Sequence, residues 1–352
     1  MTAPPRVSVL HLVGSAVDEF HAELSRLYAR ACLAALPGED YDVLLAYVSP
    51  DGSWRFPADL SAEALSSARP LPVSKAIAHL RSLRVDVVVP QMFCLPGMTS
   101  YRRLLSALRL PFIGNPPEVM EIAADKAASR AIVSQAGVAV PAGEVVRAGD
   151  RSTLPLPVVV KPVCADNSVG VSLVRTPAEL PSAIDRALAH GTSALVETYV
   201  ELGREVRCGI VVRDGELVCL PLEEYAVDTT AKPIRDHEDK LRRSQGGELY
   251  LVAKDACHAW IVPVDDPITD VVWEAARRCH LALGCRHYSL FDFRIDPDGR
   301  VWFLEAGPYC SFAPTSVIAV MAAAAGMDVA ELFADQLREL GLEGTPCLSA
   351  QR

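Results

Sequence analysis

Short apolar runs and helical patterns alternate over the first third of the chain. The apolar runs have the length of strands, and between them apolar residues recur at a spacing of three and four. Such alternation predicts a doubly wound, parallel α/β domain over residues 1–115. The predicted strands are 6–13, 41–48, 85–89 and 110–113, and the predicted helices are 18–36, 73–83 and 101–108.

The pattern changes after Pro116-Pro117, where two prolines interrupt the chain. The pattern over residues 116–200 predicts a smaller α+β domain, and the pattern over residues 201–352 predicts a second one. Within the latter, a polar and weakly periodic stretch at 226–260 predicts a functional lid or a disordered insertion. The predicted helices are 118–136 and 177–190, and the predicted strands are 138–144, 158–161, 194–200, 205–213, 215–222 and 299–305.

Composition narrows the class of protein. The length of 352 residues favours two or three domains. The formal charge of −10 argues against a nucleic-acid partner. The first residues lack a signal-peptide pattern, and no apolar run reaches the ~20 residues of a membrane span. Ten scattered cysteines without a C-x-x-C pair predict reduced thiols in a cytoplasmic protein.

A lysine at the end of an apolar run is the strongest chemical signal. In the segment VVVKPVCADNSVG, residues 158–170, Lys161 ends a predicted strand and a loop of small and polar residues follows. A cation beside such a loop suits a nucleotide polyphosphate, whereas a solvated surface lysine is the alternative. Lys126 and Lys240 also lie beside acidic or small-residue segments, and each alone is typical of a surface lysine.

Two acidic residues flank a predicted hairpin turn over 296–299. Counted back from the turn, Asp292 and Glu305 fall near opposite positions of its two strands. Carboxylates that close repel unless a cation lies between them, and Mg²⁺ with triphosphate oxygens meets that need. Alternatively, one of the two pairs with an arginine such as Arg294 or Arg300.

Glu197 ends another apolar run, and Glu205 follows eight residues later, past Gly203. A strand that leaves one domain and enters the next at this point offers backbone groups to an adenine edge. A carboxylate just beyond it suits the ribose hydroxyls as an acceptor. An ion pair between Glu205 and Arg204 or Arg207 is the alternative.

Together these segments resemble the ATP-grasp superfamily and, within it, the D-alanine–D-alanine ligases, best from about residue 116 to residue 332. The resemblance implies an ATP-grasp fold, in which a doubly wound N-terminal domain precedes two α+β domains that clasp ATP. The segments that carry it, in the family's order, are ADKAASRAIVSQAGVAVP, LPVVVKPVCADNSVGVSLV, LVETYVELGREV, DHEDK and DFRIDPDGRVWFLEAGP.

The resemblance also implies roles for residues. Two lysines and a small-residue loop contact the phosphates, a hinge meets the adenine, one glutamate holds the ribose, and a lid lysine lies near the γ-phosphate. The residues that it places at the nucleotide are Lys126, Lys161, Asn167, Ser168, Glu197, Tyr199, Val200, Glu205 and Lys240, and those that it places at the metal are Asp292 and Glu305.

The reaction that the resemblance implies is carboxylate–amine ligation. ATP phosphorylates a carboxylate, an amine attacks the acyl phosphate, and an amide, ADP and phosphate result. The implied cofactors are ATP and Mg²⁺, with Mn²⁺ as an alternative metal, and the implied partners are two amino acids. The family is commonly dimeric through its first domain, so a homodimer is expected.

Several positions depart from the ligase pattern. The arginine that supports the tetrahedral oxyanion in the family is Leu290 here, and an asparagine metal ligand is Gly307. A histidine-glycine pair of the first domain is replaced by QMFC at 91–94. The segment that holds the second substrate's carboxylate reads YCSFAPTS at 309–316. The nucleotide half is therefore retained, while both amino-acid pockets are rewritten.

These departures leave candidates for substrate binding and catalysis. Ser311 and Ser316 are candidate substrate contacts in the rewritten segment. Glu19 is a candidate for the ammonium of an amino acid, and its alternative is a helix N-terminal acid favoured by the helix dipole. The catalytic candidates are Lys240, Ser168 and Arg294, and the other arginines that could replace the missing cation are Arg235, Arg242, Arg243 and Arg286.

We therefore predict an ATP-dependent ligase that joins two amino acids into a specialised dipeptide, for example a γ-glutamyl or non-proteinogenic one. A D-alanine–D-alanine ligase of cell-wall synthesis is the alternative, against which Leu290 and Gly307 argue. A nucleotide-binding protein without catalysis is a third hypothesis, against which the retained lysines and carboxylates argue.

Overall fold

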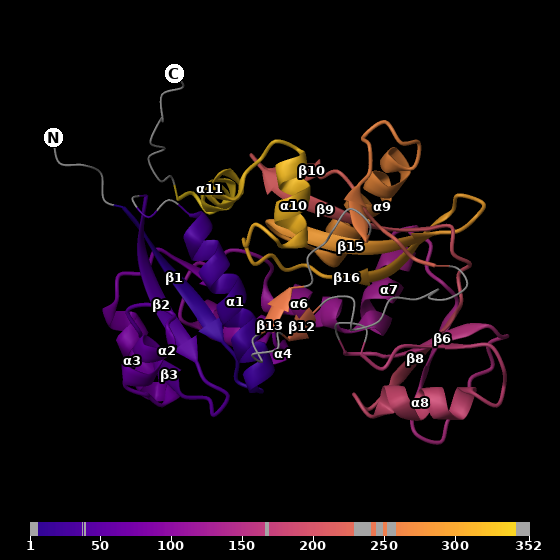
Figure 1. The fold of residues 1–352 in the computed structure, drawn as a ribbon, viewed down its shortest axis with the longest axis horizontal. Coiled ribbons are helices and arrows are strands. Elements are labelled where there is room, and N and C mark those ends of the chain that lie inside the picture. Colours follow the sequence, from indigo (N-terminus) through magenta and orange to yellow (C-terminus); the bar gives the residue numbers. More distant parts are fainter. Residues whose placement is uncertain are drawn as a thin grey trace.

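The first sheet is built around parallel strands, as predicted. The computed structural model describes residues 6–36, 38, 40–165, 169–228, 241–243, 249–251 and 258–342. The elements of the first part are β1 (Val7–Gly14), α1 (Glu19–Ala35), β2 (Tyr41–Val48), β3 (Trp54–Arg55), α2 (Ala62–Ser67), α3 (Val73–Ser82), β4 (Val87–Pro90), α4 (Leu95–Met98) and α5 (Ser100–Ala107). The strand order is β3-β2-β1-β4, with β1 parallel to both neighbours and β3 an antiparallel edge (Figure 1). The predicted strand at 110–113 contributes a single bridge, from Val88 to Phe112.

The second sheet is antiparallel and has its own hydrophobic core. Its elements are β5 (Gly143–Val146), β6 (Val158–Pro162), β7 (Ser172–Val174), α8 (Leu180–Leu188) and β8 (Ala194–Thr198). The strand order is β5-β8-β6-β7, and α8 packs on the sheet. Among the described residues, the core around Val160, Ala183 and Val196 draws only on residues 146–196. This unit lies at the lower right of Figure 1 as a separate lobe.

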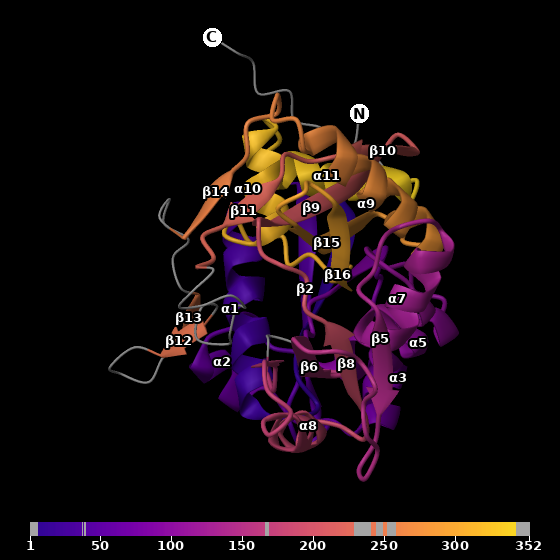
Figure 2. The ribbon, with the colours of Figure 1, turned by 90° about the vertical axis from the view of Figure 1, so that its right-hand side faces the viewer.

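The third sheet has six strands and carries helices on both faces. Its elements are β9 (Arg204–Arg213), β10 (Glu216–Cys219), β11 (Glu223–Tyr225), β14 (Ala259–Ile261), α9 (Thr269–Leu283), β15 (Tyr288–Ile295), β16 (Val301–Ala306), α10 (Val317–Ala324) and α11 (Val329–Glu339). The strand order is β14-β11-β9-β15-β16, with β10 paired to β9. α9 packs on one face, and α10 and α11 contact β9 from the other (Figure 2).

The predicted helix over 118–136 is two helices, α6 (Pro117–Ala124) and α7 (Lys126–Gln135). They are separated at Asp125, whose backbone is extended with φ −93° and ψ 101° and whose Oδ1 accepts from the Ala128 N–H at 2.8 Å. An aspartate in this role caps a new helix. The break makes Lys126 the first residue of α7, where its N–H donates to the Val163 carbonyl at 3.0 Å. α7 packs mainly on α6, α9 and β16.

The predicted strand at 138–144 begins only at Gly143. Pro141 interrupts the segment, because proline has no N–H to give to a ladder. Upstream of it, the Ala139 carbonyl accepts from the Phe303 N–H at 2.9 Å, which ties this stretch to the third sheet. The segment from α7 to β5 therefore crosses from the third sheet to the second.

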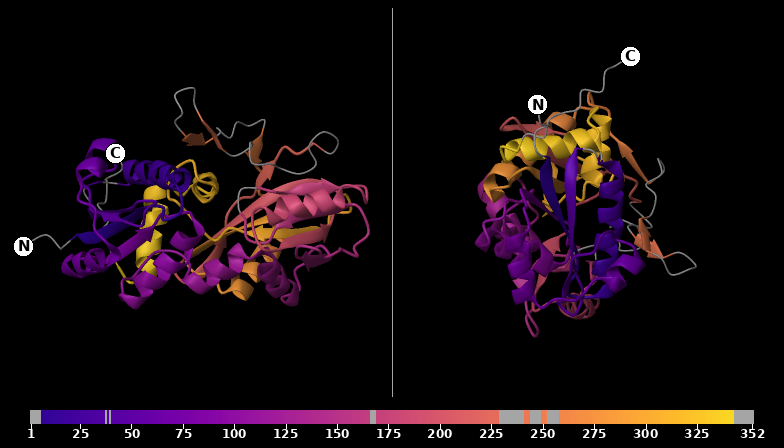
Figure 3. Two further views of the ribbon diagram at one scale, coloured as in Figure 1. Left: turned by 90° about the horizontal axis from the view of Figure 1, so that it is seen from below. Right: turned by 90° about the vertical axis from the view of Figure 1, so that its left-hand side faces the viewer.

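The last two helices join the first sheet to the third. Their apolar residues share one core with residues of β1, β2, β4, β9 and β15. Phe333 of α11 contacts Tyr41 of β2 and Phe312, with ring centres 5.4 and 5.3 Å apart. Figure 3 shows these helices lying across one end of the first sheet. The first and third sheets therefore form one body.

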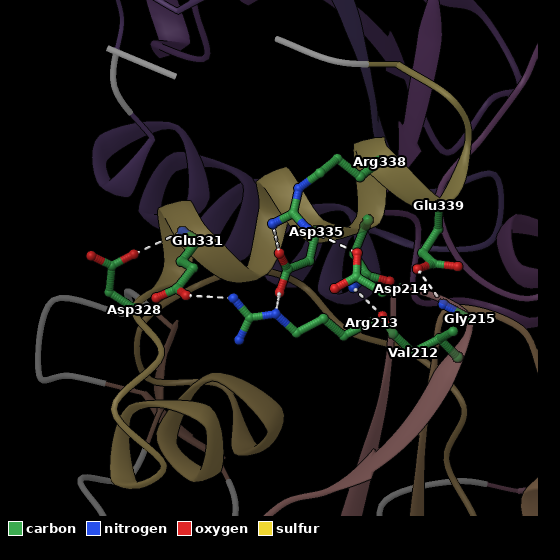
Figure 4. A network of polar contacts seen from close by, with 10 residues as sticks. Val212, Arg213, Asp214, Gly215, Asp328, Glu331, Asp335, Arg338 and Glu339 are labelled. Atoms are coloured by element: carbon green, nitrogen blue, oxygen red, sulfur yellow. Dashed lines mark hydrogen bonds and ion pairs between the residues drawn. The ribbon is translucent and has the colours of Figure 1, made fainter. Parts of the chain in front are cut away.

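Ion pairs hold α11 against the β9–β10 turn (Figure 4). Arg213 at the end of β9 lies 2.8 Å from Glu331 and 3.3 Å from Asp335. Arg338 pairs with the same Asp335 and with Asp214 of the turn, at 3.4 Å for the latter. These contacts fix the position of α11 over the third sheet.

The stretch predicted as a lid, 226–260, contains regular structure where it is described. β12 (Leu241–Arg243) and β13 (Leu249–Leu251) form a separate antiparallel hairpin, and β14 extends the third sheet. β13 lies against α1 of the first part, as Figure 2 shows. In the described parts of the chain, no single helix is long and apolar enough to cross a membrane; α10 and α11 meet those limits only as a pair bent by 103°.

Candidate active site

A pocket lies between the second and third sheets. It brings together charged residues from β6, β8, β9, β15, β16 and the start of α7. The predicted site residues among those that line it are Lys126, Lys161, Glu197, Val200, Glu205, Asp292, Arg294 and Glu305, and the other lining residues are Pro141, Val159, Pro162, Ala165, Val169, Val171, Thr198 and Leu304.

Two neighbouring strands place ion pairs in register along one face. β9 and β15 are antiparallel, so Glu205 lies opposite Arg294 and Arg207 lies opposite Asp292. Arg294 Nη2 donates to Glu205 at 2.7 Å, and Arg207 Nε and Nη2 donate to the two oxygens of Asp292 at 2.6 and 3.1 Å. Two residues before Asp292, Leu290 is buried in the core shared with the first sheet. The charged positions along β15 therefore stop at Leu290, which packs in the core at the position where the family has its arginine.

Arg207 is held in a nearly closed environment. Burial acts to lower its pKa, but Asp292 and Tyr225 raise the pKa well above its ordinary value. Its guanidinium carbon lies 5.1 Å from the centre of the Tyr225 ring, a distance at which a cation is attracted to an aromatic face. The sequence had suggested Arg207 only as a partner of Glu205. Its partner is Asp292, and its position beside that carboxylate was missed.

The two predicted metal carboxylates face each other, as the hairpin count predicted. β15 and β16 pair Asp292 with Glu305, and a bulge follows Asp292. Lys126 Nζ lies 3.4 Å from Glu305 Oε2 and donates to the Ala165 carbonyl at 2.5 Å. Asp292 therefore has Arg207 beside it, and Glu305 has Lys126. The sequence had suggested Arg294 or Arg300 for this role.

Lys161 and Glu197 form a buried ion pair inside the pocket. Lys161 Nζ lies 2.5 Å from Glu197 Oε2, and Arg130 Nε of α7 lies 3.1 Å from Glu197 Oε1. The backbone of Glu197 is paired with β5 on one side and β6 on the other. Its carboxylate, rather than its main chain, therefore faces the other groups of the pocket and holds Lys161 in place.

The pocket also has an apolar wall. Val159, Val171 and Leu304 line it, and such surfaces suit a flat base attached to the charged groups that the cations bind. Beyond β8, the Val200 carbonyl accepts from Arg294 Nη1 at 3.2 Å. Tyr199 is not among the lining residues, and the centre of its ring lies 5.6 Å from the Arg294 guanidinium carbon.

The residues present fit a hard divalent cation in part. No group of three or more histidine, cysteine or acidic side chains forms a metal site within the described residues. Asp292 and Glu305 supply two carboxylates at one edge of the pocket, and phosphate oxygens and water would complete six ligands. Mg²⁺ is usually bound in this way, through one or two carboxylates and a nucleotide.

The predicted substrate residues lie outside this pocket. Ser311 is buried, its carbonyl accepts from the Gln91 side chain at 2.9 Å, and its Oγ accepts from the Ala313 N–H at 3.3 Å. Ser316 directly precedes α10. Glu19 is the exposed first residue of α1, which is also the position of a helix N-terminal acid.

Aromatic side chains bring the two rewritten segments together. The Phe93 ring lies 6.1 Å from that of Tyr309 and 5.2 Å from that of Tyr28 in α1. Burial raises the pKa of Tyr28 to about 12, although the nearby charge of Arg207 acts to lower it. These three aromatic residues therefore lie near the Arg207 end of the charge row. The sequence singled out the segments of Phe93 and Tyr309 as departures from the family, but not their contact with each other or with Tyr28, because the three residues are far apart along the chain.

The remaining catalytic candidates are only partly described. Asn167, Ser168, Arg235 and Lys240 lie outside the described residues, and Arg242 and Arg243 are described only as backbone in β12. Arg286 donates to the carbonyls of Phe112 and Gly114, so it joins the first and third sheets rather than facing the pocket.

Two antiparallel sheets that enclose a pocket of lysines and carboxylates, behind a parallel N-terminal sheet, define an ATP-grasp protein. The family model described as "D-ala D-ala ligase C-terminus" matches residues 133–338. A D-alanine–D-alanine ligase of Citrifermentans bemidjiense is 30% identical over 69% of this chain and 75% of its own length. A putative D-alanine–D-lactate ligase of Streptomyces coelicolor is 28% identical over 88% and 90%.

A solved structure agrees with this fold. The D-Ala:D-Ser ligase VanG of Enterococcus faecalis superposes with a TM-score of 0.78 at 20% identity, over 95% of this chain and 99% of its own. The chain belongs to the D-alanine–D-alanine ligase family, and it is an ATP-dependent ligase that forms a C–N bond.

Proposed function

We propose that this ligase joins D-alanine to a second D-configured partner, with D-alanine itself as the first partner to test. The observation that carries the proposal is the convergence of Lys161, Asp292 and Glu305 on one pocket in a chain of this family. The relatives reported above differ in the partner that their names give, which is alanine, lactate or serine. We further infer that the protein acts in the cytoplasm, where ATP is available.

The reaction would proceed in two steps. The carboxylate oxygen of the first amino acid attacks the γ-phosphorus of ATP, ADP leaves, and an acyl phosphate forms. The amine of the second amino acid then attacks the acyl carbon, phosphate leaves, and the amide remains. Lys126 and Lys161 would neutralise charge on the transferring phosphoryl group, which is the main demand of phosphoryl transfer.

Asp292 and Glu305 would hold Mg²⁺, or Mn²⁺ in its place, which when bound supplies positive charge to the phosphate oxygens. Glu205 is fixed by Arg294 at the far end of the charge row, where a ribose could bind its carboxylate. Lys240 would complete the phosphate site from the lid, as the family resemblance implies. Ser168 and Asn167 would do so from the loop that follows β6.

A specialised substrate pair is the second candidate function. The buried Leu290 and the contact between Phe93 and Tyr309 favour it, because they change the surroundings of the amino acids and leave the nucleotide pocket unchanged. A γ-glutamyl or other unusual dipeptide would then be the product. The comparisons support the first candidate more strongly than this one.

Phosphate release from ATP with Mg²⁺ tests both candidates. D-Alanine alone, D-alanine with D-serine or D-lactate, and pairs containing glutamate would be compared, with product masses recorded. A product of two D-alanines that is lighter than their sum by one water supports the first candidate. Release that requires a glutamate pair supports the second, and ATP binding without release under any of these pairs would contradict the first candidate and a γ-glutamyl product. Asp292→Asn should abolish this release, because it removes a proposed metal carboxylate, whereas Arg300→Met, a change at an exposed position of the same hairpin, should leave it unchanged.

A further inference from the structure

A second row of four charges runs across β9, β15 and β16 to α7, and three of its members, Lys126, Asp292 and Glu305, line the pocket. Arg207 of β9 lies opposite Asp292 of β15, and Asp292 lies opposite Glu305 of β16. Lys126 stands beside Glu305 from the start of α7. The order along the row is positive, negative, negative, positive, and its formal charges sum to zero.

The outer cations contact the carboxylates closely. Arg207 gives one N–H to each oxygen of Asp292, at 2.6 and 3.1 Å, and the side chains of both residues are largely buried, with 12% and 15% exposed. Lys126 lies 3.4 Å from Glu305, with 11% and 31% of the two side chains exposed. Two carboxylates at facing positions repel each other, and these cations remove that repulsion without a metal.

We propose that Arg207 and Lys126 are built-in counter-ions that keep the metal carboxylates from binding a divalent cation before the nucleotide arrives. This inference rests on the proposed function, in which Asp292 and Glu305 hold Mg²⁺. A metal that approaches the empty pocket meets a neutral row, and the two cations repel it. A nucleotide brings phosphate charges that attract Lys126 and Arg207, so metal and nucleotide bind as one unit.

Arg207 should contribute more than Lys126 to keeping a metal away from the carboxylates. It binds both oxygens of its carboxylate, whereas Lys126 also gives a hydrogen bond to the Ala165 carbonyl. A planar guanidinium pairs with both oxygens of a carboxylate, and a lysine can supply the charge but not that geometry. Removing the charge of Arg207 should therefore leave the row with a net charge of −1 and open Asp292 to a metal.

Mn²⁺ binding without nucleotide tests the proposal, with the free ion measured by its electron paramagnetic resonance signal. We expect Arg207→Met to bind Mn²⁺ at least about tenfold more tightly than the unmodified protein. Arg207→Lys should stay within about threefold of the unmodified protein, because it keeps the charge. Arg300→Met, which removes an exposed arginine from the same hairpin, should leave Mn²⁺ affinity unchanged.

Second variants separate this effect from a general change. Lys126→Met should also tighten Mn²⁺ binding, and it carries the test if Arg207→Met does not fold, as judged by circular dichroism. Adding Asp292→Asn to Arg207→Met should abolish the gain. An Arg207→Met affinity within twofold of the unmodified protein, or a gain that survives Asp292→Asn, overturns the proposal. No amino acid or turnover is needed, so a wrong substrate assignment would leave these results unaffected.

Discussion

The region proposed to bind the nucleotide (the nucleotide end) and the region proposed to bind the amino acids (the amino-acid end) differ in how their side chains are held. At the nucleotide end, Lys161 pairs with Glu197 and Arg294 pairs with Glu205, so each charge is fixed by an opposite one. At the amino-acid end, Leu290 is in the core and the Phe93 and Tyr309 rings approach each other. One end is ordered by ion pairs and the other by apolar and aromatic packing.

This difference indicates which properties can vary within such a fold. Ion pairs between β-strands depend on register, so a change at one position leaves a buried charge without its partner. Aromatic contacts between loops tolerate substitution more easily, because they depend on volume and not on charge. Substrate choice can therefore change at the amino-acid end while the nucleotide end stays constant.

The largest effect is expected from Lys161→Met. It removes a cation from the phosphate region and leaves Glu197 with Arg130 alone, so we expect a loss of at least about 100-fold in kcat. Breaking a buried pair should also cost about 3 kcal/mol of stability. Steady-state kinetics and urea unfolding would measure the two effects.

Lys75→Met, an exposed lysine of α3, is the matched control and should change neither quantity. If Lys161→Met keeps full turnover, then Lys161 does not contact the phosphates. The comparison between the two ends would lose its basis in that case.

A smaller and more selective effect is expected from Phe93→Ala. The change removes one ring from the contact between the two rewritten segments, so the KM of an amino acid should rise about tenfold, which corresponds to about 1.4 kcal/mol. The KM of ATP should stay the same, because Phe93 does not line the nucleotide pocket. Initial rates with each substrate varied in turn would separate the two constants, and equal changes in both would contradict the division into two ends.

The smallest expected effect is a loss of stability at acidic pH. Burial lowers the pKa of His11 to about 4, while its bond to Gln91 acts in the opposite direction. Such a histidine stays neutral in the folded protein but takes up a proton in the unfolded chain below pH 6.5. The free energy of unfolding is therefore highest above pH 6.5 and falls as the pH drops toward 4. From pH 7.5 to 5.5 the expected loss from His11 is about 1 kcal/mol.

Urea unfolding at pH 7.5, 6.5 and 5.5 measures this loss. Two further buried histidines add to it, since burial lowers the pKa of His280 to about 4 and that of His287 to about 3. His11→Gln should reduce the slope by about one proton, whereas His190→Gln at an exposed position should not. Equal slopes in both variants would exclude His11 as a source.

The local pattern of apolar residues predicted the strands well, but it did not predict which distant strands pair. The strands at 41–48 and 205–213 follow from apolar runs, and the facing of Asp292 and Glu305 follows from counting back along a hairpin. Arg207 was not placed beside Asp292, because the two residues are 85 positions apart and meet only when β9 pairs with β15. Pairing between distant strands depends on the whole fold and leaves no local signature.

The break at Asp125 was missed for a different reason. The apolar spacing continues from α6 into α7, so periodicity alone predicts one helix. Only the cap geometry of Asp125 separates the two. The replacement of the family arginine by Leu290 was visible in the sequence, but its consequence was not, since the core that buries Leu290 is shared by two sheets.

That shared core has a consequence for how the chain is made. Val9 of β1 and Tyr41 of β2 pack with Ile318 of α10 and Phe333 of α11, which are synthesised long after the first sheet. Until then, that face of the first sheet is covered only in part, by Cys32 and Leu36 of α1, and the remaining apolar residues are open to chaperones or to other nascent chains. A fragment that ends at residue 115 should therefore aggregate, although it contains every strand of the first sheet.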